Sequence, residues 1–275
     1  MGHTQGLMAT CRRGGSSGRR CRPAARIAGV AAVLLGLAFG APARALGDEA
    51  GLLDTVFELF TYTTQGQGVT RGTAFFIDPN GLALTNSHVV HRALHDPEHY
   101  VLLAVVGKEF YGVKILCAST LEVDPMEVSK GPVSRDIAEI QLVAPDAMYA
   151  LWGILAGGGT TIIARAHQGP LPIFPVLTFG DGPQERGQIR VIGFGRAAQA
   201  EEKTIATGTI TLTAVAKDGT PVFEIQSPAR PERGSSGSPV LNDQDRVVGM
   251  YTWNDTSNDA AGIAISSAAL ARACP

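Results

Sequence analysis

The sequence predicts an all-β protein built from two antiparallel β-barrels. From Leu52 onward, short apolar and β-branched runs are broken by Gly, Pro, Asn and Asp, a spacing typical of antiparallel sheets folded into barrels or sandwiches. These runs fall into two halves of about six each. The roughly 230 residues that follow residue 45 fit one all-β unit or two small barrels and are enough to bury a proper core.

The first half contains five runs with the composition of strands. Helix signals are scarce here, and only residues 88–95 are predicted to form one or two helical turns. The expected strands are 72–77, 82–86, 100–106, 111–116 and 137–143.

The pattern loosens in the middle of the chain, where a Gly triplet and a Gly-Pro pair interrupt it. We interpret residues 151–172 as the connection between the barrels, with 160–164 as a further candidate strand. The first barrel is then expected within 46–150. The second, which ends in a short C-terminal helix at 267–273, is expected within 173–275. Its strands are predicted at 175–179, 188–194, 207–215, 221–225, 238–241, 246–253 and 261–265.

The first 45 residues differ in composition from the rest. Six arginines precede an apolar run at 27–40, and residues 43–45 have the small-residue spacing that a signal peptidase recognises. This pattern predicts a signal peptide at 1–45. An uncleaved anchor is the alternative, although the run is shorter than the roughly 20 residues of a spanning helix. Two Arg-Arg pairs suggest twin-arginine export, but neither is followed by apolar residues, which favours the general secretory route.

Removal of this segment makes the chain acidic. The segment holds seven arginines and no acidic residue, so 16 of the 23 basic residues remain against 25 acidic ones, and the net charge moves from −2 to about −9. Nucleic acid would repel such a chain. No later apolar run is long enough to span a bilayer, so we expect no stable membrane insertion after signal cleavage, and a periplasmic or secreted location.

Two cysteines, Cys117 and Cys274, follow residue 45. In an oxidising compartment they can form a disulfide. The alternative is a buried, inert Cys117 within an apolar strand. With so few cysteines, a fold stapled by many disulfides is excluded.

A run of small residues at 232–242, ERGSSGSPVLN, has the composition of a nucleophile loop around Ser236. Glycines let the backbone bend so that N–H groups converge on one point, and small side chains leave room for a substrate carbonyl. Gly/Ser clusters followed by Pro most often form plain turns, so the loop needs support from elsewhere in the chain.

A serine hydroxyl needs a base to accept its proton and a third group to hold that base. His88 stands where an expected strand runs into a small-residue turn, a position that can aim an imidazole into a cleft. Asp136 leads directly into an expected strand, which would place its carboxylate at a barrel rim, and Asp124 is the second choice. The alternative for each residue is an ordinary surface or structural role.

Three motifs in this order, TNSHVV around His88, RDIAEIQL around Asp136 and RGSSGSPVLN around Ser236, resemble those of the trypsin-like (chymotrypsin-fold) serine proteases. The resemblance is strongest to the bacterial branch with HtrA-type and glutamyl-endopeptidase-like enzymes. Two flanking stretches, PVLTFGDGPQERGQIRVIGFG and RVVGMYTWN, extend it over about residues 72–265. It implies two six-stranded antiparallel β-barrels of chymotrypsin type. About ten residues follow Ile265, so no PDZ domain is expected.

The resemblance also implies the roles of the catalytic residues. Ser236 would attack the scissile carbonyl, and His88 would act as general base and then as general acid. Asp136 would fix the tautomer of the imidazole and stabilise the imidazolium. The backbone N–H groups of Gly234 and Ser236 would form the oxyanion hole.

Residues on the substrate side follow from the same comparison. The hydroxyl of Thr252 would support the triad acid, and the backbone of Thr252, Trp253 and Asn254 would pair antiparallel with a peptide. Arg230 falls where the family often places the residue at the floor of the specificity pocket, and a cation there would favour Asp or Glu. An exposed Arg230 is the alternative, and Tyr251 stands where glutamyl endopeptidases tend to carry a histidine.

Other residues with reactive side chains are not assigned as the nucleophile or as metal ligands. Only Ser236, and neither Ser235 nor Ser238, has glycine at the correct position on both sides, with Gly234 two residues before it and Gly237 directly after it. His91 and His95 lie one helical turn apart, but no Cys or Glu partner accompanies them in a metal-binding pattern, so no metal and no cofactor are expected.

The sequence therefore predicts an exported serine endopeptidase that acts on protein or peptide substrates, with its oligomeric state left open. A catalytically inactive, protease-like scaffold that binds a partner is the alternative. A serine esterase of the α/β-hydrolase type is disfavoured, because it requires Ser before Asp before His and alternating strands and helices.

Overall fold

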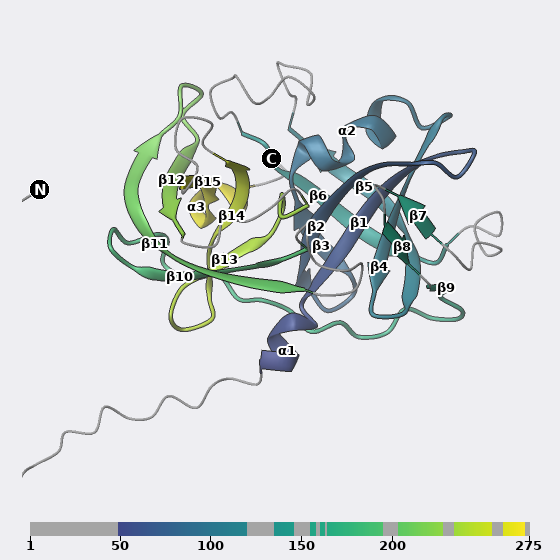
Figure 1. Cartoon of the computed structure of the whole chain (residues 1–275), viewed down its shortest axis with the longest axis horizontal. Helices are drawn as coiled ribbons and strands as arrows, with labels where there is room; N and C mark the ends of the chain where they lie inside the picture. Colours follow the sequence, from purple (N-terminus) through teal and green to yellow (C-terminus); the bar gives the residue numbers. More distant parts are fainter. Residues whose placement is uncertain are drawn as a thin grey trace, which may run out of the picture. The chain divides into compact units, whose positions relative to one another are not determined.

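Two closed antiparallel β-barrels contain most of the strands, which confirms the predicted fold class (Figure 1). The first barrel is drawn in blue and teal and the second in green and yellow. The structure is a computed structural model. It describes residues 49–119, 135–145, 155–157, 160–162, 164–194, 203–227, 234–254 and 261–272.

The first barrel has six strands in the order β4-β1-β2-β3-β6-β5, and pairing of β4 with β5 closes it. All of these pairings are antiparallel. The short strand β9 (Arg165–Ala166) adds to β5 in parallel. The six strands are β1 (Val56–Thr63), β2 (Gly68–Asp78), β3 (Leu82–Thr85), β4 (Tyr100–Val106), β5 (Glu109–Ala118) and β6 (Ala138–Val143).

The second barrel also has six strands, in the order β10-β11-β12-β15-β14-β13, and pairing of β10 with β13 closes it. Its pairings are likewise antiparallel. The strands are β10 (Gln188–Gly193), β11 (Thr204–Val215), β12 (Pro221–Gln226), β13 (Pro239–Leu241), β14 (Val247–Asn254) and β15 (Ala261–Ser266).

The remaining elements are short. Strands β7 (Leu155–Gly157) and β8 (Thr160–Ile162) form an antiparallel pair. The helices are α1 (Glu49–Leu53), α2 (Ser87–His95) and α3 (Ser267–Leu270). Within the described ranges, no helix combines the length and the apolar composition needed to cross a bilayer.

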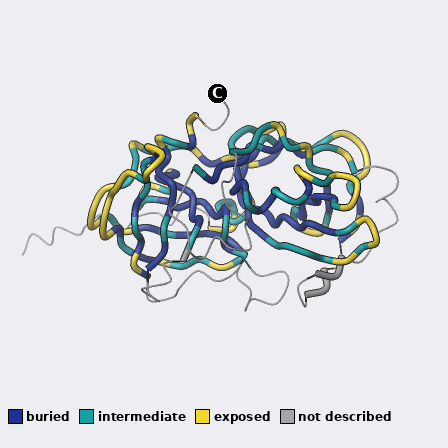
Figure 2. The backbone as a smooth tube through the Cα atoms, turned by 90° about the horizontal axis from the view of Figure 1, so that it is seen from above, coloured by how far each residue is buried: buried dark blue, intermediate teal, exposed yellow. Residues whose placement is uncertain are grey.

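The alternation of side chains along β1 and β2 explains why the barrels pack together. Successive residues of a strand point to opposite faces. Phe57 and Phe76 point into the core of the first barrel, whereas Val56 and Phe75 belong to a cluster that also contains Ile192 and other residues of the second barrel. Val56 at the start of β1 and Phe75 of β2 are thus buried against the second barrel. Figure 2 shows buried residues through the interior and exposed residues mainly at the outer bends of the chain.

Most of the expected elements are present. The five strands of the first half and the helix at 88–95 all have counterparts, and β4 has the predicted bounds. The strand expected at 175–179 is absent, because this segment makes only an isolated bridge from Phe179 to Val247. Pro175 has no N–H to donate to a ladder, which weakens a strand there. Strand β1 and helix α1 were not expected.

Candidate active site

His88 and Asp136 are held together by two hydrogen bonds. The imidazole Nδ1 of His88 lies 2.6 Å from Oδ2 of Asp136, and the backbone N–H of His88 donates to Oδ1 at 2.9 Å. The carboxylate is fully buried, and 17% of the His88 side chain is exposed. With Nδ1 donating to a carboxylate, Nε2 is left to accept a proton. This is the arrangement that a general base requires.

Local sequence explains how the two residues meet. Strand β3 ends at Thr85, and Asn86 begins α2 as its N-cap, so His88 lies in the first turn of the helix. The hydroxyl of Ser87 donates to the carbonyl of Ile137 at 2.7 Å, which ties this turn to the segment that carries Asp136. The small-residue turn predicted before His88 is therefore the start of α2.

Asn86 links the acid to the second barrel. An N-cap Asn usually accepts a hydrogen bond from its own helix, but the side chain of Asn86 makes no such bond. Its Nδ2 instead donates to the carbonyl of Asp136 at 2.7 Å and to Oγ1 of Thr252 at 3.0 Å. The Thr252 hydroxyl itself donates to the carbonyl of Met250. Thr252 thus reaches the backbone of Asp136 through Asn86.

The sequence analysis did not single out Asn86. The signal that was available is its position two residues before His88, inside the motif TNSHVV. Its importance comes from contacts with residues 50 and 166 positions away, which no local pattern reveals.

Two glycines shape the loop around Ser236. Gly234 and Gly237 have φ angles of 105° and 88°, which L side chains rarely adopt. A Cβ at Gly237 would lie 2.0 Å from the carbonyl oxygen of Thr73, and one at Gly234 would lie 2.5 Å from that of Phe194. The loop therefore requires glycine at both positions to pack against these two backbone groups.

The hydroxyl of Ser236 donates to the carbonyl of Thr252 at 3.4 Å. In the part of the chain that the structure describes, no hydrogen bond joins this hydroxyl to His88. The backbone N–H groups of Gly234 and Ser236 donate to no described residue either.

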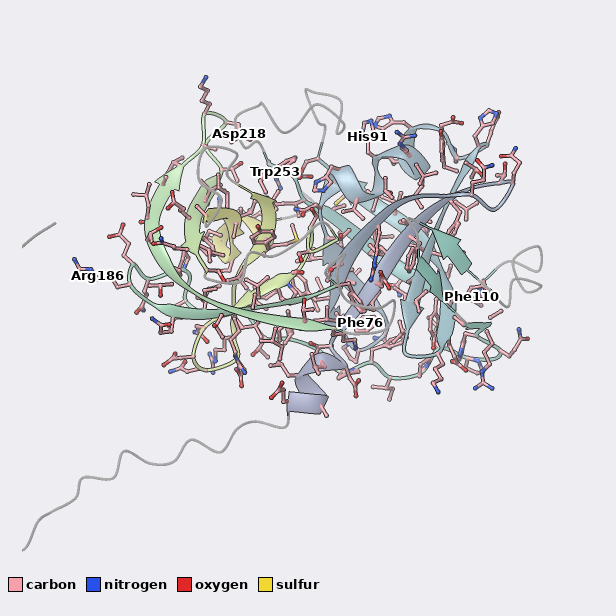
Figure 3. All side chains as sticks on the ribbon, viewed as in Figure 1. Phe76, His91, Phe110, Arg186, Asp218 and Trp253 are labelled. Carbon is pink, nitrogen blue, oxygen red and sulfur yellow. The ribbon has the colours of Figure 1, made fainter. Side chains whose placement is uncertain are left out.

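Trp253 and the end of β14 border the same region. The indole of Trp253 stacks on the imidazole of His88, with ring centroids 5.0 Å apart and planes at 27°. Trp253 lies at the end of the second barrel nearest α2 (Figure 3). Strand β13 pairs with β14 only as far as Met250, whereas β15 pairs with it through Asn254. Among the described residues, the edge from Thr252 to Asn254 therefore lacks a strand partner on one side.

Arg230 and Asp124 lie outside the described residues. The rings of His91 and His95 lie 4.3 Å apart on α2. Among the described His, Cys, Asp and Glu side chains, no three are grouped so that they would hold a metal ion.

Cys117 forms a disulfide, so the alternative of a buried free thiol is wrong. Its partner lies outside the described residues, which include no other cysteine.

Comparisons with solved structures show the fold. The Rv3671c protease from M. tuberculosis in its active form matches with a TM-score of 0.53 and 19% identity, over 82% of this chain and 81% of that one. Its inactive form gives 0.51 and 16%, over 82% and 89%. The serine endoprotease from Yersinia pestis gives 0.52 and 16%, over 80% of this chain and 61% of that one.

A comparison with family profiles identifies the family. The profile described as the trypsin-like peptidase domain matches residues 72–250. This range covers more than half of the chain and contains His88, Asp136 and Ser236. The chain therefore belongs to the trypsin-like peptidase family and is a trypsin-like serine protease.

Proposed function

We propose that this protein is an exported endopeptidase that cleaves peptide bonds with Ser236 as nucleophile, His88 as base and Asp136 as the acid that holds the base. The observation that carries the proposal is the doubly bonded pair of His88 and the fully buried Asp136 carboxylate. Such a pair fixes one tautomer and stabilises the imidazolium that forms during catalysis.

The reaction begins when the Ser236 hydroxyl rotates from the Thr252 carbonyl toward His88. Nε2 of His88 takes the proton while Oγ forms a bond to the scissile carbonyl carbon, and the negative charge moves to the carbonyl oxygen. The N–H groups of Gly234 and Ser236 stabilise this oxyanion. His88 then returns the proton to the leaving amine as the C–N bond breaks, which gives an acyl-enzyme. Water, activated by His88, hydrolyses the ester and restores Ser236.

The substrate is a protein or peptide in extended conformation. The edge of β14 from Thr252 to Asn254 has backbone groups without a strand partner among the described residues, and these suit antiparallel addition of a peptide. Arg230 would add a preference for Asp or Glu on the acyl side of the cleaved bond. Cleavage of a peptide library after apolar residues alone would contradict this preference.

Export is supported by two independent observations. Residues 1–45 have the basic start, apolar run and small-residue site of a signal peptide. Cys117 forms a disulfide, and structural disulfides persist mainly in oxidising compartments.

A fluorophosphonate probe tests the proposed nucleophile. The purified protein should be labelled, and Ser236→Ala should abolish the label. Ser235→Ala is a matched control, because the neighbouring serine is buried and should leave labelling intact. A folded wild-type protein that takes no label would favour the inactive scaffold.

A further inference from the structure

Thr73 is a buried residue of the first barrel that holds the nucleophile loop of the second. It lies in the middle of β2 and is 0% exposed. Its backbone N–H donates to the carbonyl of Ser236 at 2.8 Å, and its hydroxyl donates to the carbonyl of Gly234 at 2.8 Å. The same hydroxyl accepts from the N–H of Phe194 at 3.2 Å. A single residue thus binds the loop on both sides of the Ser235–Ser236 peptide unit.

The direction of the hydroxyl is fixed by its partners. Phe194 offers an N–H, which can only donate, so the hydroxyl proton of Thr73 must point to the other partner, the Gly234 carbonyl. The carbonyl of Thr73 is itself held by the hydroxyl of Thr85 at 2.7 Å, one residue before the N-cap of α2. Thr73 is therefore anchored to the segment that leads to His88.

These bonds determine how the Ser236 N–H is aimed. In a planar trans peptide unit the N–H and C=O point in opposite directions. The unit that contains the Ser236 N–H has its own carbonyl, that of Ser235, bonded to the N–H of Ser238 at 3.0 Å. The preceding unit is held at the Gly234 carbonyl and the following unit at the Ser236 carbonyl, both by Thr73. Three consecutive peptide units are thus fixed.

We propose that Thr73 is a positioning residue that keeps the oxyanion hole in its donor-ready geometry, an inference that rests on the proposed function of the site. Gly237 supports it, because a Cβ at this position would lie 2.0 Å from the Thr73 carbonyl and 2.5 Å from the Thr85 hydroxyl. The loop therefore packs so closely against Thr73 that no side chain fits at Gly237. Oxyanion stabilisation depends on donors that are oriented before the charge develops.

Replacement of the hydroxyl alone isolates this effect. Thr73→Val keeps the shape of the side chain but leaves the Gly234 carbonyl and the Phe194 N–H without their partner. The backbone bond to Ser236 remains. Thr73→Ser keeps the hydroxyl and loses only a methyl group, so it should retain activity close to that of the wild type.

The test compares these variants in steady-state kinetics on a peptide substrate and in inhibition by a peptide boronate, which mimics the tetrahedral intermediate. In Thr73→Val, kcat should fall by about 10- to 100-fold, less than the 10²–10³ typical of deleting an oxyanion donor, and boronate affinity should fall in parallel. KM should change little. Binding of a product peptide, measured with Ser236→Ala and with the Ser236→Ala/Thr73→Val double variant, should be equal. Thr73→Ser should stay within about threefold of wild type.

The matched control is Thr55→Val, because Thr55 is also buried and its hydroxyl also donates to a backbone carbonyl, that of Leu52. It should keep wild-type kcat.

The proposal is overturned if Thr73→Val retains kcat within threefold, if Thr73→Ser loses as much as Thr73→Val, or if product binding falls as far as boronate binding. A wild-type protein that neither hydrolyses peptides nor takes a fluorophosphonate would instead refute the proposed function. In that case, faster hydrogen exchange of residues 234–241 in Thr73→Val, with no change in Thr73→Ser, would still show that Thr73 fixes the loop.

Discussion

The side-chain amide of Asn86 donates a 2.7 Å hydrogen bond to the backbone carbonyl of Asp136. The same nitrogen donates to the hydroxyl of Thr252 at 3.0 Å, and Asn86 is 0% exposed. Both N–H groups of the amide therefore connect the segment that carries Asp136 to β14 of the second barrel. The relationship makes Asn86 a structural link between the two halves of the site.

Replacement of Asn86 by Leu should weaken both stability and catalysis. The variant leaves the buried Asp136 carbonyl without its donor, which should lower the free energy of unfolding by about 1–3 kcal/mol. A less firmly held Asp136 should also reduce kcat more than it changes KM. Thr252→Val should cost less, since Asn86 still holds Asp136. Urea unfolding and steady-state kinetics measure the two effects, and equal losses in both variants would contradict this ranking.

Replacement of Asp136 by Asn should reduce kcat by about 10⁴-fold, because the amide no longer fixes the productive tautomer of His88. The backbone N–H of His88 and its Nδ1 both face this carboxylate at present. Asp78→Asn serves as a control, since Asp78 caps the N–H of Asn80 at 2.8 Å and an Asn oxygen can do the same. A mild effect of Asp136→Asn on kcat would argue against its assignment as the acid.

His167 should make stability depend on pH. Its Nδ1 lies 2.8 Å from Glu109 and its Nε2 lies 2.9 Å from the carbonyl of Pro170, so both nitrogens face acceptors. The hydrogen bond to Glu109 raises the pKa of His167, and the bond from His167 lowers the pKa of Glu109. Arg165 and Tyr111 are the other groups that face this carboxylate.

The directions of the two pKa shifts define the pH range in which the pair of His167 and Glu109 stabilises the protein. Stabilisation by His167 is fully present below its unfolded pKa of about 6.5 and is lost as pH rises through its higher folded pKa. Stabilisation by Glu109 is present above its unfolded pKa of about 4.3 and is lost as pH falls through its lower folded pKa. The pair should therefore contribute most between these limits. His167→Gln should flatten the dependence of the urea midpoint on pH above 6.5.

His99 provides a matched control for this experiment. It lies 2.8 Å from Asp96, but its side chain is 66% exposed. Exposed pairs contribute little to stability. His99→Gln should therefore leave the pH profile of the urea midpoint nearly unchanged. Similar changes in both variants would show that the pair of His167 and Glu109 affects the pH dependence of stability no more than the exposed pair of His99 and Asp96.

Cys117 should pair with Cys274 in the exported protein. Cys117 forms a disulfide, and Cys274 is the only other cysteine that remains once residues 1–45 are removed. Digestion without reductant should release one cross-linked peptide pair, and Cys274→Ser should leave Cys117 as a free thiol. A covalent dimer on a non-reducing gel would indicate pairing between chains instead.

The strands were predictable where local composition was sufficient. Strand β4 reads YVLLAVV and has the predicted bounds, because every residue suits a buried strand. Strand β1 reads VFELFTYT and was missed, because Glu58 and Thr61 interrupt the apolar run although both are buried. The charge of Glu58 is compensated by Arg71 on the neighbouring strand, a contact that exists only after the sheet has formed.

Two of the predicted site residues are in contact in the structure, whereas the residues that hold them in place were not predicted. His88 and Asp136 each lie in a recognisable motif, and the structure brings them into contact. The local sequence around Thr73 and Asn86 does not show which distant residues they contact. Thr73 meets Gly234 across 161 residues, a separation at which only the packing of the two barrels defines the partner.

The buried ion pair of Glu58 and Arg71 provides the last prediction. The side chains are 2% and 13% exposed, and the guanidinium also lies 5.9 Å from the ring of Phe60. Burial of the guanidinium removes solvation of its charge and so lowers the pKa of Arg71. A pair in such a setting gains little over an apolar replacement, but loss of one member leaves the other charge unpaired.

Arg71→Met should therefore lower the free energy of unfolding by about 3–5 kcal/mol, because the carboxylate of Glu58 remains buried without its partner. The double variant Glu58→Leu/Arg71→Met should recover most of this loss, since neither charge remains. Urea unfolding of the two single variants and the double variant gives the coupling free energy. Arg165→Met is the control, because the Arg165 side chain is 81% exposed in its pair with Glu109 and its loss should cost less than about 1 kcal/mol. If the double variant is as unstable as the sum of the single variants, the two charges are not coupled, and Glu58 must be stabilised by the surrounding sheet instead.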